Sequence, residues 1–259
     1  MNIDLTNKVI VITGGAQGIG KATSIEFAKC GAIICVVDKN IQKGKEIESI
    51  LQSYNSLSAY YYADVASETD IEIVMDKIES SFSVIDVLVN CAASGIIKGI
   101  NASVEEWHEV FQTNVIGYVL CSKYCLEAMK RSKHGAIINI ASISGFIAQP
   151  NYLTYNTSKA ALLNMTRCLA MDLAKYNIRV NSVCPGTIWT ENNAYFIGRD
   201  FGVDREGANK HPDIGGKHLL GRVGDPEEVA KTIVFLASEE ASFITGENLV
   251  VDGGYTIKS

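Results

Sequence analysis

Short apolar runs alternate with longer amphipathic stretches along this chain of 259 residues. The runs are rich in β-branched residues, which favour strands. They occupy residues 8–13, 32–38, 58–64, 85–90, 135–142, 178–185 and 247–254. The first six are apolar at consecutive rather than alternate positions, which is typical of strands that are covered on both faces. The pattern therefore predicts seven strands with helices on both sides of the sheet.

The stretches between the runs carry the signals of helices. Residues 18–30 end just before Gly31, residues 67–80 open with a serine and an acidic first turn, and Pro226 stands at the first position of a further helix. The spacers are roughly 15 to 40 residues long, which is enough for crossovers between parallel strands. We therefore predict an α/β fold, in which residues 1–259 form a single Rossmann-type domain with a doubly wound parallel sheet of seven strands.

One segment interrupts this rhythm. Residues 187–217 are polar, contain five glycines and lack sustained periodicity, yet they carry several aromatic side chains. Long irregular segments in compact domains are usually lids or binding loops. We interpret this segment as a substrate lid, and a surface loop without a role is the alternative. Trp189, at its start, suits a pocket wall and a packing role equally.

Composition and charge exclude several classes of protein. The chain is 47% hydrophobic and 20% charged, as is usual for a soluble globular protein. It has 23 basic and 29 acidic residues, a net charge of −6, and so no basic surplus for a nucleic acid backbone. The uncharged stretch 135–158 contains Asn, Gln and Ser side chains that a membrane-spanning helix would bury unpaired. We therefore expect neither a nucleic acid nor a membrane as a partner.

The cysteines and histidines indicate no metal site. The seven cysteines form no CxxC pair and have no histidine at ligand spacing, so we interpret them as buried small hydrophobic residues in a reducing compartment. Because the first residues form neither a basic leader nor a long apolar run, we predict a cytoplasmic protein. We interpret His211 and His218, in or beside the lid, as solvent-exposed loop residues.

The first candidate site follows the first predicted strand. There the sequence reads Thr-Gly-Gly-Ala-Gln-Gly-Ile-Gly over residues 13–20, directly before a helix. Glycines allow the backbone to approach a pyrophosphate, and the free amides and dipole of the helix start stabilise its charge. A purely structural turn is the alternative, but the strand before the turn and the helix after it favour a dinucleotide-binding turn.

Two carboxylates stand at the ends of the next two strands. Asp38 follows Gly20 by 18 residues and can accept hydrogen bonds from the adenosine ribose, whereas a 2′-phosphate there would meet like charge. We therefore predict NAD rather than NADP, although Lys39 is placed to offset part of the repulsion. Asp64 and Val65 could contact the adenine in the same way, and a simple turn-forming role for Asp64 is the alternative.

Four polar residues downstream are candidates for proton transfer: Asn114, Ser142, Tyr155 and Lys159. Tyr155 and Lys159 are four residues apart in a helical stretch, so their side chains leave the same face. A phenol is a poor base at neutral pH, but a neighbouring ammonium favours the phenolate and lowers the phenol pKa. The pair is therefore suited to acid–base chemistry.

In these motifs the sequence resembles the short-chain dehydrogenase/reductase family over nearly its whole length. Ser142 precedes Tyr155 by 13 residues, the usual interval in that family. A departure is Asn90-Cys91-Ala92-Ala93, where the family usually has NNAG. The matching motifs are TGxxxGxG from Thr13 to Gly20, Asp64, Asn90, Asn114, Ser142, YxxxK at Tyr155 and Lys159, and Pro185-Gly186 followed by Ile188 and Thr190.

The resemblance implies a role for each matching residue. Tyr155 would be the general acid/base, Lys159 would hold the nicotinamide ribose and lower the tyrosine pKa, Ser142 would bind the reacting oxygen, and Asn114 would position a water leading to Lys159. Ile188 and Thr190 would touch the carboxamide of the cofactor. The implied cofactor-binding set is Gly14, Gln17, Gly18, Ile19, Gly20, Asp38, Asp64, Val65, Asn90, Ala92, Tyr155, Lys159, Pro185, Gly186, Ile188 and Thr190.

We therefore predict an NAD-dependent oxidoreductase acting on a secondary alcohol or its ketone, such as a sugar or a hydroxysteroid, with Ser142, Gln149 and Tyr155 contacting the substrate. Ser94 and Tyr152 are further candidates for the pocket. A 3-oxoacyl-thioester reductase is one alternative, which Asp38 disfavours, and a non-catalytic dinucleotide-binding sensor is another, which the complete set of four polar residues disfavours. The resemblance also implies a homo-oligomer, most commonly a tetramer.

Overall fold

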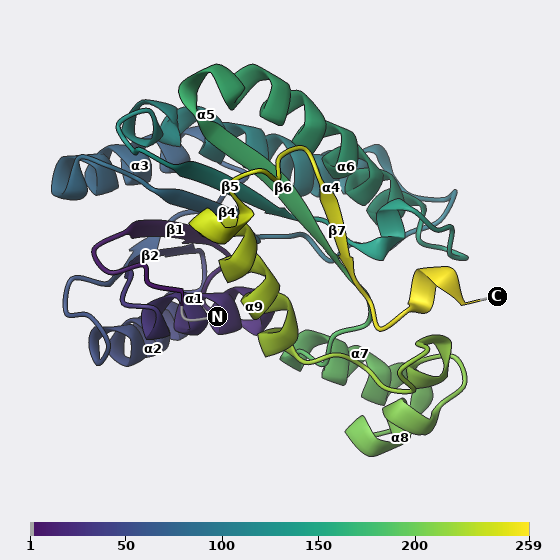
Figure 1. Ribbon diagram of the computed structural model, residues 1–259. Helices are drawn as coiled ribbons and strands as arrows, with labels where there is room; N and C mark the ends of the chain where they lie inside the picture. The colour runs from purple at the N-terminus through teal and green to yellow at the C-terminus, as the bar shows by residue number, and fades with distance from the viewer. Residues whose placement is uncertain (1–2, 259) are drawn as a thin grey trace.

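The computed structural model describes residues 3–258. Their seven strands form one parallel sheet with the order β3-β2-β1-β4-β5-β6-β7. All seven predicted strands are present, so the predicted doubly wound α/β fold is confirmed (Figure 1). The strands are β1 (Val9–Thr13), β2 (Ile33–Asp38), β3 (Ala59–Tyr62), β4 (Val87–Asn90), β5 (Gly135–Ile140), β6 (Ile178–Pro185) and β7 (Asn248–Val251).

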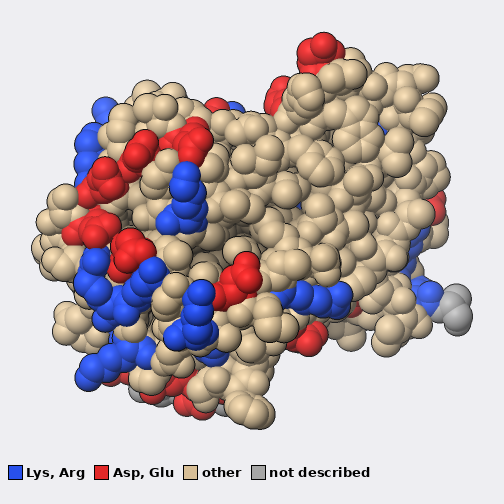
Figure 2. Space-filling view, turned by 90° about the horizontal axis from the view of Figure 1, so that it is seen from above, with Lys and Arg blue, Asp and Glu red and all other residues tan. Residues whose placement is uncertain are grey.

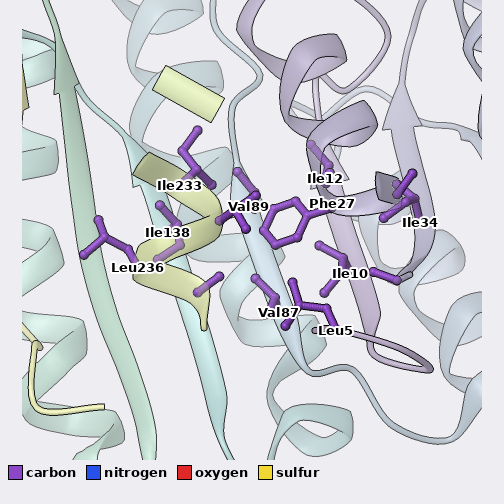
Figure 3. Close-up of a cluster of buried hydrophobic side chains, with 14 of the residues drawn as sticks. Leu5, Ile10, Ile12, Phe27, Ile34, Val87, Val89, Ile138, Ile233 and Leu236 are labelled. Carbon is purple, nitrogen blue, oxygen red and sulfur yellow. The ribbon is translucent and has the colours of Figure 1, made fainter. Parts of the chain in front are cut away.

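Successive residues of the central strands enter two different hydrophobic cores. In β1, Ile10 and Ile12 face one core while Val9 and Val11 face the other, as strand geometry requires. Figure 3 shows the first core, where Phe27 lies among isoleucines and valines of the sheet. The consecutive apolar pattern of the sequence thus reflects burial on both faces.

Helices cover both faces of the sheet (Figure 1). The core on one face includes side chains of α1 (Gly18–Lys29), α2 (Ile41–Gln52) and α9 (Pro226–Ala237). The core on the other includes those of α3 (Glu68–Phe82), α5 (Gly117–Met129) and α6 (Leu153–Leu173). A short helix, α4 (Val104–Phe111), leads through a π-helical turn at Gln112–Ile116 into α5.

The order of the strands determines where a ligand can bind. The chain moves outward from β1 to β2 and β3, then returns to β4 on the other side of β1. Ligands of doubly wound sheets bind where the strand order reverses, at the carboxyl ends of the strands. Thr13 at the end of β1 and Asn90 at the end of β4 are register partners at this point.

The lid segment is more regular than the sequence analysis expected. It contains α7 (Glu191–Phe201) and α8 (Arg205–Lys210), so the expectation of an irregular segment was wrong. The helices are closed by local caps: Thr190 and Asp204 accept N-terminal amides, and Gly202 ends α7 at a φ of 68°. Trp189 packs against the small core of this segment around Ile197, which favours the packing role over a pocket wall.

Two side-chain expectations were also wrong. His218 is 3% exposed because its ring packs edge to face against Tyr255 and its Nδ1 is within hydrogen-bond distance of the Asp252 carbonyl oxygen. Cys168 is exposed on α6, and Cys30 and Cys91 are only partly covered, whereas the other four cysteines are buried as predicted. Within residues 3–258 no helix is long and apolar enough to cross a bilayer, and no cluster of three or more His, Cys, Asp or Glu side chains is placed to hold a metal.

Candidate active site

The glycine turn between β1 and α1 is built for close approach of a ligand backbone. Gly14 has a φ of 64°, and a Cβ there would lie 2.7 Å from the Ala92 Cα. A Cβ on Gly20 would overlap the carbonyl oxygen of Gly14. Side chains are thus excluded at both positions by neighbouring backbone, and the turn can form only with glycine.

The start of α1 presents unpaired amides. Gln17 is the N-cap residue, but its side chain makes no capping hydrogen bond, and the first turn carries no acidic residue. An uncapped helix start has several free N–H donors and a partial positive charge, which together bind phosphate. This arrangement fits the pyrophosphate of a dinucleotide.

Asp38 ends β2 beside this turn and is 8% exposed. Its Oδ2 accepts the amide of Ala16 at 3.1 Å and its Oδ1 accepts that of Asn40 at 2.9 Å. The carboxylate therefore fixes the turn, and its remaining lone pairs are available to ribose hydroxyls.

Asp64 is both a turn former and half of an ion pair. Its Oδ1 accepts the amide of Ala66 at 3.0 Å, and its Oδ2 lies 3.2 Å from the Lys39 ammonium. The turn-forming alternative is thus observed, and contact with adenine stays a prediction. Val65 is buried beside the start of α5, where its carbonyl oxygen would lie 2.8 Å from a Cβ added to Gly117.

The end of β4 contains an unsatisfied polar atom. Asn90 is fully buried, its Nδ2 donates to Asn139 Oδ1 at 3.0 Å, and its own Oδ1 has no hydrogen-bond partner among the described residues. An unpaired buried acceptor costs about 1–3 kcal/mol, so a ligand that donates to it is stabilised there. Thr13 Oγ1 accepts the amides of Cys91 and Ala92 and so fixes the neighbouring loop, a role that the sequence analysis missed.

Asn114 lies in the π-helical turn between α4 and α5 and is fully buried. Its Oδ1 accepts the amide of Ser94 at 2.7 Å, and its Nδ2 donates to Ser158 Oγ on α6 at 3.1 Å. Single π-helical turns often mark functional sites because they redirect one side chain. Asn114 connects the loop after β4 to the helix that carries Tyr155 and Lys159, and the water that it would position stays a prediction.

Tyr155 and Lys159 lie one turn apart on α6, as predicted from their spacing. The Lys159 Nζ is 5.7 Å from the centroid of the Tyr155 ring and donates to the Ile140 carbonyl oxygen at 2.8 Å. Lys159 is 2% exposed. The last residue of β5 thus fixes the ammonium beside the phenol.

Burial dominates the acid–base properties of this pair. It lowers the pKa of Lys159 to about 8. It also raises the pKa of Tyr155 above its ordinary value, although the neighbouring Ser142 hydroxyl lowers it in part. The expectation that the Tyr155 pKa is lowered was therefore wrong for the protein alone, because burial raises the Tyr155 pKa more than the Ser142 hydroxyl lowers it.

Ser142 is the first member of a hydrogen-bonded series. Its Oγ accepts the amide of Ser144 at 3.1 Å, and the Ser144 hydroxyl donates to Gln149 Oε1 at 2.9 Å. Because the Ser142 oxygen already accepts one hydrogen bond, its own proton remains available to a substrate oxygen. The same series holds Gln149 with its amide nitrogen free to donate.

A cavity of about 890 Å³ opens beside these residues. Ser142, Gln149, Tyr152 and Tyr155 line it, as predicted, whereas Ser94 does not. The lid supplies a large part of the opposite wall, including Asn193, Phe196, Ile197, Arg199, Phe201, Ile214 and Lys217. Most of these lid residues escaped the sequence analysis, because a pocket wall made by a distant segment leaves no local pattern.

The loop after β6 contributes the floor of the cavity. Gly186 and Thr187 line it beyond Pro185, the last residue of β6. Ile188 is 4% exposed, belongs to the hydrophobic core and borders a smaller cavity of about 340 Å³ instead. Its carbonyl oxygen accepts the Asn193 side-chain amide at 2.8 Å, so its contact with a cofactor carboxamide stays a prediction.

Residues 14–256 match a family model described as enoyl-(acyl carrier protein) reductase, which is a model of short-chain dehydrogenases/reductases. The chain belongs to the short-chain dehydrogenase/reductase family. The resemblance inferred from the motifs is thereby confirmed, and the dinucleotide cofactor of the family fits the uncapped helix, the glycine turn and the unpaired Asn90 oxygen.

The similar proteins are oxidoreductases, and the similarity extends over nearly the whole length of both chains. An oxidoreductase of Thermotoga maritima is 38% identical over 260 residues, which cover 98% of each chain. The NAD-dependent glycerol dehydrogenase of Listeria innocua is 35% identical over 261 residues, covering 99% of this chain and 97% of that protein. The crystal structure of L-sorbose reductase from Gluconobacter frateurii, complexed with NADPH and L-sorbose, has a TM-score of 0.92 at 33% identity, with both chains fully covered.

Proposed function

We propose that this short-chain dehydrogenase/reductase is an NAD(H)-dependent enzyme that interconverts a neutral secondary alcohol and its ketone. The observation that carries the proposal is Tyr155 at the wall of the cavity, with the Ser142 hydroxyl beside the phenol and the buried Lys159 ammonium behind it on α6. Sugars, polyols and hydroxysteroids are the substrate classes of suitable size, because a cavity of several hundred Å³ accommodates molecules of that order.

When bound, the nicotinamide supplies the hydride donor or acceptor. In reduction, Tyr155 Oη donates its proton to the carbonyl oxygen, and in oxidation it accepts the proton of the alcohol. The Ser142 proton, left free by the contact with Ser144, binds the same substrate oxygen and orients it. The Lys159 ammonium, fixed by Ile140, stabilises the phenolate when the proton has left.

The charges at the adenosine end support NAD. Asp38 presents a carboxylate where a 2′-phosphate would lie, and the two lysines that follow it already contact carboxylates, Lys39 with Asp64 at 3.2 Å and Lys43 with Glu191 at 2.6 Å. A 2′-phosphate would therefore be repelled by Asp38, and both Lys39 and Lys43 are already paired with other carboxylates.

Removal of the Asp38 charge should change the preference between cofactors. In Asp38→Asn an oxygen remains to accept the Ala16 amide, whereas Asp38→Ala removes both charge and acceptor. We expect the kcat/KM ratio of NADP to NAD to rise at least about tenfold in both variants. Steady-state rates with each cofactor measure this. A rise in Asp38→Ala alone would assign the effect to the shape of the turn, and an unchanged ratio in both would remove Asp38 from the role.

The cavity wall favours a neutral substrate. It carries Lys98, Arg199 and Lys217 against Glu106, Asp200 and Asp213. Lys98 pairs with Glu106 at 3.2 Å and Arg199 with Asp200 at 2.6 Å. Because these charges balance, an anionic substrate gains little attraction from the wall, which supports an alcohol over a 3-oxoacyl thioester on an acidic carrier.

The direct test follows absorbance of the reduced cofactor with a panel of sugars, polyols, hydroxysteroids, cyclic alcohols and acyl thioesters, each with NAD and NADP. We expect turnover with at least one neutral alcohol. Turnover with acyl thioesters alone would favour the reductase alternative, and tight cofactor binding without any turnover would favour the sensor.

We further propose a cytoplasmic homo-oligomer, most simply a tetramer. On the face formed by α3, α5 and α6, charged side chains gather over one part and a broad area is nearly free of them (Figure 2). Val119 on α5 and Met171 on α6 are 41% and 81% exposed. Exposed apolar helix faces of this kind commonly mark contacts between protein chains. Light scattering after size exclusion should give about four times the chain mass, and Met171→Glu should lower that mass; a wild-type mass of one chain would contradict the proposal.

A further inference from the structure

The Lys43 ammonium joins three segments that are distant in sequence. Lys43 lies in the first turn of α2, and its Nζ donates to Gln17 Oε1 at 3.0 Å and to Glu191 Oε2 at 2.6 Å. Gln17 belongs to the glycine turn, and Glu191 is the first residue of α7 in the lid. One side chain thus connects the adenosine-side helix, the phosphate-binding turn and the lid.

The start of the lid also lies close to the glycine turn. A Cβ added to Gly18 would lie 3.4 Å from the Thr190 methyl group, so little more than a methyl group would fit between the two residues. Thr190 is the N-cap of α7, so the residue that lies next to Gly18 and the residue that pairs with Lys43 are neighbours at the start of one helix. The start of α7 therefore lies against the turn on which the pyrophosphate of a dinucleotide would lie.

The contacts of Lys43 have the character of a specific link. The Gln17 side chain makes no capping hydrogen bond to α1, and its oxygen accepts from Lys43. The hydrogen bond from Lys43 lowers the pKa of Glu191 below its ordinary value, as expected for a carboxylate that an ammonium stabilises. The Lys43 side chain is 32% exposed and that of Glu191 is 69% exposed, so water and salt can reach the pair.

We propose that Lys43 is a positioning residue that holds the start of α7 on the glycine turn, so that its bond to Glu191 must open before the dinucleotide cofactor can leave. This inference rests on the dinucleotide site of the proposed function and requires no knowledge of the substrate. An ion pair of this exposure is worth roughly 0.2–1 kcal/mol, which corresponds to about a 1.4- to 5-fold change in rate. The pair therefore modulates release and does not block it.

The experiment measures how fast the cofactor leaves the enzyme in the absence of any substrate. The enzyme is loaded with NADH, or with NADPH if that binds more tightly, and mixed rapidly with excess oxidised cofactor while the fluorescence of the reduced form is followed. The variants are Glu191→Gln, which keeps the size of the side chain, and Lys43→Met. The matched control is Glu206→Gln, which removes the carboxylate of another lid pair, Glu206 with Lys210 at 2.6 Å.

We expect Glu191→Gln and Lys43→Met to release the cofactor about two- to fivefold faster than wild type, with Glu206→Gln unchanged. The charge-exchanged double variant Lys43→Glu with Glu191→Lys should recover most of the wild-type rate. Equal rates in wild type and Glu191→Gln would overturn the proposal, as would a control variant that releases the cofactor equally fast.

Salt provides a test that needs no substitution. Between about 0.01 M and 1 M NaCl the screening length falls from about 30 Å to about 3 Å, which weakens an exposed ion pair. Release from the wild-type enzyme should therefore accelerate with salt more steeply than release from Glu191→Gln, whereas a merely structural role for Lys43 predicts parallel curves. Absence of turnover on every alcohol would refute the proposed function while leaving these rates measurable, and failure of both cofactors to bind would overturn the two together.

Discussion

Replacing Tyr155 by phenylalanine should lower kcat by about 10²–10⁴, the usual contribution of a general acid/base, while the cofactor affinity changes less than about twofold. The substitution removes a single oxygen from a half-buried ring at the cavity wall and leaves the packing of α6 intact. Rates from cofactor absorbance and affinities from fluorescence titration separate the two effects. Tyr152→Phe, on the same cavity wall, is the control and should alter KM by no more than a few-fold.

The pH profile gives this prediction a second readout. Oxidation requires the phenolate, and burial raises the pKa of Tyr155, so the oxidation rate should increase toward alkaline pH. Reduction requires the phenol proton and should decrease over the same range. The residual activity of Tyr155→Phe should show neither the alkaline rise of the oxidation rate nor the alkaline fall of the reduction rate. A variant with a near-normal rate, or with an unchanged profile, would assign the proton transfer to another group.

Replacing Lys159 by methionine should remove activity and at the same time stabilise the fold. We expect kcat/KM to fall by at least about 10², because the ammonium no longer stabilises the phenolate or binds the cofactor ribose. The stability gain follows from the burial of the charge, which lowers the pKa of Lys159 to about 8. Lys123→Met, an exposed lysine of α5 paired with Glu68, is the control and should leave activity unchanged.

The sign of the stability effect follows from proton linkage. An unfolded lysine keeps its proton to about pH 10.4, whereas folded Lys159 releases it near pH 8, so the wild type gains stability as the pH rises between these values. Below pH 8 the penalty of the buried ammonium is complete, at most about 3 kcal/mol, and exceeds the roughly 1 kcal/mol lost with the hydrogen bond to Ile140. Lys159→Met should therefore melt a few degrees higher at neutral pH and lose this advantage above about pH 10.

Thermal unfolding of both proteins across this pH range measures the difference. If Lys159→Met melted lower than wild type at pH 7, Lys159 would be a net stabiliser of the fold, and the idea that its burial is tolerated for the sake of the reaction would fail.

The strands and the chemical residues were predictable because their signals are local. Consecutive apolar runs fix buried parallel strands, and the glycine turn and the YxxxK pair each lie within a few residues of chain. The lid helices were missed because α7 is polar and contains Gly198, so its apolar residues show no clear helical spacing. Its caps, Thr190 and Gly202, were the signal that could have revealed it.

Other features depend on contacts that no local pattern encodes. His218 is buried because Asp252 and Tyr255, more than thirty residues away, surround its ring. The bond between Lys43 and Glu191 joins residues separated by 148 positions. The pKa shift of Tyr155 was misjudged in direction because the sequence shows the neighbouring lysine but not the depth of burial.

The origins of the cavity wall have an evolutionary consequence. The groups assigned to proton transfer lie shortly after β5, on α6 and in the π-helical turn before α5, whereas the wall facing them comes largely from the single stretch between β6 and α9. Insertions and substitutions in that stretch can change which substrate the cavity accepts, while the reacting groups keep their positions. A common chemical apparatus can in this way serve metabolites as unlike as a triol and a ketose, the compounds for which two of the similar enzymes are named.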